Sequence, residues 1–138
     1  MLAKNDLKTL SVARIEDAIV LYQAGKSSSA YYLAGYAIEL AIKVCISNLF
    51  QAGVIPDKAL VNATYSHNLE HLMNVAGLKP DLQKQLKQNA QFSAYWGIVS
   101  KWSEQSRYTI TDPVTAAHLI TSIQDPENGV LEWLKQHW

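Results

Sequence analysis

The residues best suited to chemistry are an arginine and a glutamate in largely apolar surroundings. Arg107 lies in the stretch KWSEQSRY, next to Tyr108, and Glu39 lies in the stretch SAYYLAGYAIELAIKVCISNLF. The guanidinium of arginine presents a fork of N–H donors that fits a carboxylate or a phosphate. Two roles are therefore open to Arg107: a structural bridge to Glu39, or the binding of an anionic ligand.

An enclosed carboxylate such as that of Glu39 needs a partner. Lys43 lies four residues further along the same predicted helix, a spacing that contributes only about 0.2 to 0.5 kcal/mol. We therefore expect Arg107 to bridge to Glu39 and to fasten two helices together, with Lys43 as the weaker alternative.

Tyrosines are concentrated near Glu39. Tyr31, Tyr32 and Tyr36 fall within two helical turns. Their rings pack in the protein while their hydroxyls find partners, or they form a platform on which nucleic-acid bases stack. The predicted ligand-binding residues are Arg107, Tyr108, Glu39, Tyr36 and Tyr32.

Other reactive side chains give weaker signals. His67 and His71 are four residues apart, which suits two metal ligands, but no further Cys, His or Asp pair accompanies them. We expect no metal and no cofactor. Cys45 is the single cysteine and stands between Val44 and Ile46, a setting typical of an inert buried thiol.

Helical spacing of apolar residues dominates the chain, and no strand pattern competes with it. The pattern predicts helices at about 7–24, 29–50, 67–76 and 80–102, and a fifth that starts at Thr111 or Asp112. Gly25, Gly53 and Gly77 separate the first elements, and Pro126 and Gly129 interrupt the last one. The sequence therefore predicts an all-α fold, an up-and-down bundle of four to five helices in one domain over 1–138.

Composition limits the functional classes. The twelve Lys and Arg balance the twelve Asp and Glu, so any nucleic-acid site is a local patch rather than a basic surface. Segment 29–50 is long enough to span a membrane, but Glu39 and Lys43 near its centre argue against this. We expect a cytoplasmic protein, with one face of this segment at a homodimer interface.

Four stretches together resemble the HEPN (higher eukaryotes and prokaryotes nucleotide-binding) domain family: AYYLAGYAIELAIK, SHNLEHLMNVAGL, WSEQSRY and DPENGVLEWLKQHW. The resemblance extends over roughly 13–138. It implies a helical bundle, often homodimeric, found in prokaryotic toxin–antitoxin pairs and defence systems and beside nucleotidyltransferase partners.

The resemblance also implies which residues a catalytic member would have. Many members of the family are metal-independent ribonucleases whose arginine precedes a histidine by four to six intervening residues. The corresponding positions after Arg107 hold no histidine, and His118 lies further along. We therefore expect a non-catalytic or accessory module that binds a partner protein, a nucleotide or RNA. The alternatives are an endoribonuclease toxin that uses Arg107 with His118 or a tyrosine hydroxyl, and a plain helical interaction domain.

Overall fold

A computed structural model describes residues 2–138, and within them every regular element is a helix. The all-α class is therefore confirmed. The elements are α1 (Lys4–Gln23), α2 (Ser27–Ser47), α3 (Lys58–Thr64), α4 (Leu69–Val75), α5 (Lys79–Gln88), α6 (Ala90–Val99), the 3₁₀ helix η1 (Glu104–Tyr108), α7 (Pro113–Gln124) and α8 (Val130–Lys135).

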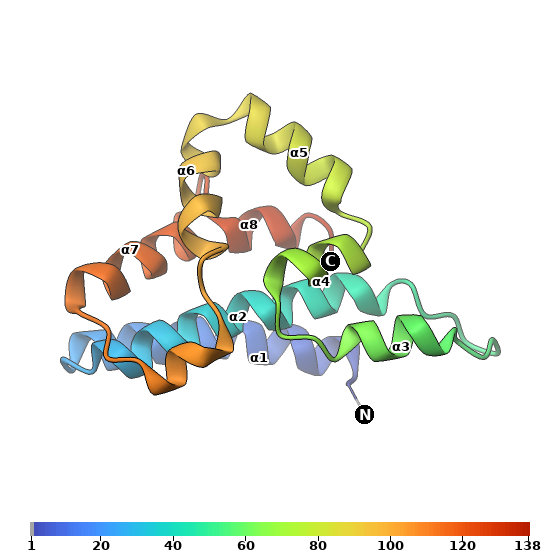
Figure 1. The fold of residues 1–138 in the computed structure, drawn as a ribbon, viewed down its shortest axis with the longest axis horizontal. Helices are drawn as coiled ribbons and strands as arrows, with labels where there is room; N and C mark the ends of the chain where they lie inside the picture. Colours follow the sequence, from blue (N-terminus) through green and yellow to red (C-terminus); the bar gives the residue numbers. More distant parts are fainter. Residues whose placement is uncertain (1) are drawn as a thin grey trace.

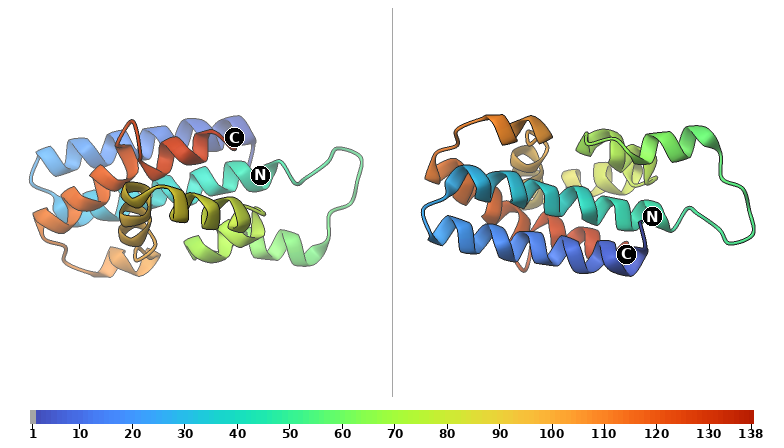
Figure 2. Two further views of the ribbon diagram at one scale, coloured as in Figure 1. Left: turned by 90° about the horizontal axis from the view of Figure 1, so that it is seen from above. Right: turned by 90° about the horizontal axis from the view of Figure 1, so that it is seen from below.

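The two longest helices, α1 and α2, form an antiparallel hairpin, and α7 and α8 run along it (Figure 1). Gly25 makes the turn of the hairpin with a φ of 78°, a left-handed conformation that glycine adopts without strain. The pair α5 and α6 projects away from the hairpin on the side of α7 and α8, with α6 packed against α7 (Figure 1). Helices α3 and α4 lie beside the C-terminal half of α2 (Figure 2).

The number of helices exceeds the predicted four to five, because the predicted helix at 80–102 is broken. Asn89 has extended backbone angles, and its side chain accepts a hydrogen bond from the N–H of Phe92 at 2.9 Å. It thus ends α5 and caps α6. Asp57 likewise caps a short helix, α3, in a segment for which the sequence predicts only an irregular connection.

The start of α7 agrees with the prediction. Asp112 caps it through a 2.8 Å hydrogen bond from the N–H of Thr115, and Pro113 occupies the first turn. The last element restarts at Gly129, as the interruption in the sequence indicates.

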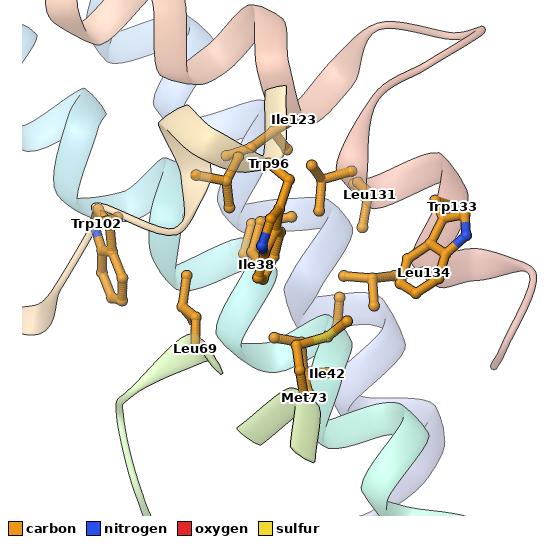
Figure 3. Close-up of a cluster of buried hydrophobic side chains, with 14 of the residues drawn as sticks. Ile38, Ile42, Leu69, Met73, Trp96, Trp102, Ile123, Leu131, Trp133 and Leu134 are labelled. Carbon is orange, nitrogen blue, oxygen red and sulfur yellow. The ribbon is translucent and has the colours of Figure 1, made fainter. Parts of the chain in front are cut away.

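A single hydrophobic cluster joins α2 to the helices around it. Ile38 and Ile42 of α2 face Leu69 and Met73 of α4, with Trp96, Trp102 and residues of α7 and α8 beside them (Figure 3). Burial of this apolar surface is the main force that holds the helices together.

The apolar character of α2 is explained within one chain. Thirteen of its residues are buried, and α1, α4, η1, α7 and α8 all pack against it. Tyr32, Leu33 and Tyr36 of α2 stay only partly buried, and a subunit interface on one face of this helix stays a prediction. By length and composition, α2 is the one helix of the described residues that resembles a membrane span, but 67% of its apolar window is buried inside the fold, which is consistent with a soluble protein.

Candidate functional site

Glu39 lies in the middle of α2 with only 1% of its surface exposed. One carboxylate oxygen, Oε1, is 2.9 Å from Nδ1 of His67, and the other, Oε2, is 3.4 Å from Nζ of Lys43. Lys43 is itself 7% exposed. Each carboxylate oxygen therefore has a partner. These contacts offset the free-energy cost of burying the charged group.

His67 connects two acids that come from different parts of the chain. Its Nδ1 contacts Glu39, and its Nε2 is 3.3 Å from Oε2 of Glu104. A ring protonated on both nitrogens donates to both carboxylates, whereas a neutral ring donates to one only. The ring therefore ties α2, the segment before α4, and η1 to one another.

The predicted bridge between Glu39 and Arg107 is wrong, because His67 occupies the place at the Glu39 carboxylate that the prediction gave to the guanidinium. Arg107 stands on η1, exposed to solvent, with its guanidinium carbon 4.9 Å from the ring centroid of Tyr108. No ion pair joins it to an acid in the described residues. The weaker sequence alternative, a pair between Glu39 and Lys43, is the one that forms.

Three aromatic rings hold the segment just before η1 against α2. Tyr32 stacks on Trp102, with centroids 6.2 Å apart and an interplanar angle of 29°, and Tyr36 meets Trp102 edge-on at 6.2 Å. The indole lies directly against the backbone of Gly35, where a side chain would overlap it. Gly35 therefore allows the approach of the segment that carries Arg107.

Burial raises the pKa of Tyr36, and the negative charge of Glu39 raises it further. Burial also raises the pKa of Tyr31. Both phenols accordingly stay protonated at neutral pH and can donate a hydrogen bond.

Arg107 borders a hollow of about 410 Å³ between η1 and the start of α2. We call it the Arg107 hollow. Its polar wall is formed by Ser28, Ser29, Ser106, Arg107 and Thr109, and its apolar wall by Leu21, Tyr32 and Leu33. The volume is within the range of about 300 to 1,000 Å³ typical of small-molecule sites.

Two groups at this hollow are short of hydrogen-bond partners. No side chain caps the N-terminus of α2, so the first-turn N–H groups near Ser28 and Ser29 have no intrahelical acceptor. Ser106 is 9% exposed, and its hydroxyl finds no partner in the described part of the chain. Together with the guanidinium, these donors favour an anion.

The predicted site residues are only partly brought together. Tyr32 and Arg107 line the same hollow, and Tyr108 lies beneath the guanidinium. Tyr36 and Glu39 belong to the buried network next to the hollow rather than to its wall. His118 lies exposed on α7 and does not line the Arg107 hollow.

Sequence reasoning missed His67, Glu104 and Ser106 as members of this region. The only signal for His67 was its spacing from His71, which suggested a metal site or a cap. Its true partner, Glu39, is 28 positions away. Among residues 2–138 no three His, Cys, Asp or Glu side chains are grouped as metal ligands would be.

Comparison with protein-family models, with curated proteins and with solved structures finds no match.

Proposed function

We propose that this chain is a non-catalytic, HEPN-like helical module that binds a nucleotide or single-stranded RNA through the Arg107 hollow. The observation that supports the proposal is that Arg107 forms no ion pair with an acid in the described residues. His67 and Lys43 satisfy Glu39, so the guanidinium is free to bind a phosphate.

The chemistry of the hollow supports a nucleotide rather than a simple anion. The hydroxyls of Ser29 and Thr109 line the same hollow as Arg107 and are available to a phosphate there, while the Tyr32 ring on the apolar wall offers a surface for a base. Stacking on an aromatic ring contributes about 1 to 3 kcal/mol per base and tolerates different sequences.

The arrangement favours binding over cleavage. Cleavage of RNA without a metal needs a proton-transfer group beside the arginine. His118 is not at the hollow, and both ring nitrogens of His67 are already engaged by carboxylates. The homodimer, the nucleotidyltransferase-type partner and the toxin–antitoxin context stay predictions from the resemblance.

The proposal is tested by titrating a fluorescein-labelled single-stranded RNA with the protein and following anisotropy. Arg14, the only other arginine, pairs with Asp17 on α1 and supplies the matched control. We expect Arg107→Ala to weaken binding by about tenfold or more and Arg14→Ala to leave it unchanged. Absence of binding by the parent protein, or equal losses in the two variants, would contradict the proposal.

A second assay separates binding from catalysis. The parent protein and Arg107→Ala are incubated with the same RNA in EDTA, and the RNA is resolved on a gel. We expect intact RNA in both. Cleavage that persists in EDTA and disappears in Arg107→Ala would establish the ribonuclease alternative instead.

A further inference from the structure

A second hollow, of about 340 Å³, lies beside the Arg107 hollow and shares two of its residues. We call it the Tyr31 hollow; the residues that matter for its chemistry are Tyr31, Lys101, Ser106, Thr109 and Asp112. Ser106 and Thr109 line both hollows, so the two spaces meet at the C-terminal end of η1.

From this arrangement we infer that the two hollows form one site for two consecutive nucleotides of a single strand, with the connecting phosphodiester at Ser106 and Arg107. The inference rests on the proposed function, because it takes the Arg107 hollow as the first of the two positions.

Each hollow contains one tyrosine and one cation. Tyr31 and Tyr32 are consecutive residues of α2, and one lines each space. Lys101 lies in the Tyr31 hollow, as Arg107 lies in the Arg107 hollow. A ring for the base and a cation for the backbone are the two components from which single-strand sites are built. Their repetition across a shared boundary matches the repeat of a nucleotide chain.

Charge decides where the phosphate lies. The Tyr31 hollow contains Lys101 but also Asp112, whose pKa is lowered chiefly by the hydrogen bond from the N–H of Thr115, so that the carboxylate is charged at neutral pH. The two charges there offset each other. The Arg107 hollow has no acid on its wall, and the nearby Glu104 is paired with His67. A phosphate is therefore favoured at Arg107 and disfavoured in the Tyr31 hollow, which is left for the base.

The boundary between the hollows also contains an unpaired hydroxyl that a ligand oxygen could accept from. The Ser106 hydroxyl is enclosed and has no hydrogen-bond partner in the described part of the chain, although buried hydroxyls are normally paired. A phosphodiester oxygen or a sugar hydroxyl at this boundary supplies the acceptor. Because each base must separate from its neighbour to enter its own hollow, the site selects single strands over duplexes.

The test compares a mononucleotide with dinucleotides by isothermal titration calorimetry. The ligands are adenosine monophosphate, the RNA dinucleotide ApA and its DNA counterpart. We expect at least one dinucleotide to bind about tenfold tighter than the mononucleotide, as a second stacked base should contribute. A tenfold gain for either dinucleotide supports the inference. The tighter of the two dinucleotides shows whether the site prefers ribose or deoxyribose.

Variants of the Tyr31 hollow make the test specific. Tyr31→Ala should reduce dinucleotide affinity to the mononucleotide level without changing mononucleotide affinity, whereas Arg107→Ala should weaken both. Lys101→Ala should lower dinucleotide affinity alone and in part, because it leaves the charge of Asp112 unopposed in the Tyr31 hollow. Lys84→Ala, an exposed lysine on α5, is the control for Lys101. Lys101 is exposed, so its variant keeps the test decisive even if loss of the partly buried Tyr31 ring disturbs folding.

Equal affinity for mononucleotide and dinucleotide, with both lost in Arg107→Ala, would overturn the two-nucleotide site and leave the proposed function intact. Failure of every ligand to bind would overturn the proposed function itself. The two results are distinguishable in one set of titrations.

Discussion

At the scale of single residues, His67 decides whether the buried acid of α2 is satisfied. Replacing it by alanine removes the 2.9 Å contact to Glu39 and leaves Lys43, at 3.4 Å, as the remaining partner. Because a buried acceptor without its partner carries a desolvation penalty, we expect His67→Ala to lower the free energy of unfolding by about 1 to 3 kcal/mol.

Urea unfolding followed by circular dichroism measures this change. His71 is the matched control, since it lies four residues further along, is exposed, and makes no side-chain hydrogen bond. His71→Ala should unfold close to the parent midpoint. Equal midpoints for His67→Ala and the parent would show that Lys43 alone compensates the acid.

The thiol of Cys45 illustrates how burial fixes reactivity. Desolvation raises its pKa to about 11, although its backbone hydrogen bond and the charge of Lys4 oppose the shift. Since the thiolate is the reactive form, a higher pKa means less thiolate at any pH below it, so we expect iodoacetamide to modify the folded protein about a hundredfold more slowly than an exposed cysteine at pH 8.

The control for Cys45 is the same labelling reaction in guanidinium chloride, where the single thiol becomes accessible and should react at the ordinary rate. Mass spectrometry counts the modified molecules at each time. Rapid modification under native conditions would mean that the α2 core opens readily around this residue.

At the scale of elements, the contact between α2 and η1 depends on the absence of a side chain at Gly35. A Cβ there would overlap the indole of Trp102. We expect Gly35→Ala to destabilise the protein by about 1 to 3 kcal/mol, the range for overpacking a core. Because Trp102 directly precedes the segment that carries Arg107, the same variant should also weaken RNA binding.

Gly97 provides the opposite case within the same fold. It lies inside α6, and a Cβ there would meet no atom within 4 Å. Replacing a helical glycine by alanine reduces the entropy cost of folding, so Gly97→Ala should stabilise by about 0.5 to 1 kcal/mol. Both variants are compared by urea unfolding. Stabilisation of both would mean that Trp102 moves aside without cost.

How far the sequence predicts such elements depends on whether their signals are local. The start of α7 was predictable because Asp112 and Pro113 are adjacent to it. The break at Asn89 was not, since the amide of Asn89 both caps α6 and donates to Oδ1 of Asn128 at 2.8 Å, a contact that spans 39 positions.

The same distinction applies to the candidate site across the whole molecule. Arg107 and Tyr32 are two of the five residues that the sequence predicts to bind a ligand, and both line one hollow, whereas Tyr36 and Glu39 do not. The partner of Glu39 could not be predicted, because a histidine 28 positions away competes with the arginine only once α4 and η1 are packed on α2. Pairing of charges across helices is a property of the packed chain, not of any segment.

The balanced charge of the whole molecule leads to a last prediction, about salt. Twelve basic residues offset twelve acidic ones, which does not favour a broad basic surface, and the proposed site holds one phosphodiester, at Arg107, as its main ionic contact. Each neutralised phosphate of a single strand contributes about −0.7 to the slope of log K against log salt concentration. We therefore expect a slope of about −0.7 to −1.4 for a short RNA.

Anisotropy titrations between low and physiological salt measure the slope, and Arg107→Ala should bring it close to zero while Arg14→Ala leaves it unchanged. A slope several times steeper, or one that persists in Arg107→Ala, would require a track of further cations along the strand. The lysines of α5 would then be the first to replace, because Lys79, Lys84 and Lys87 are exposed on one helix remote from the two hollows.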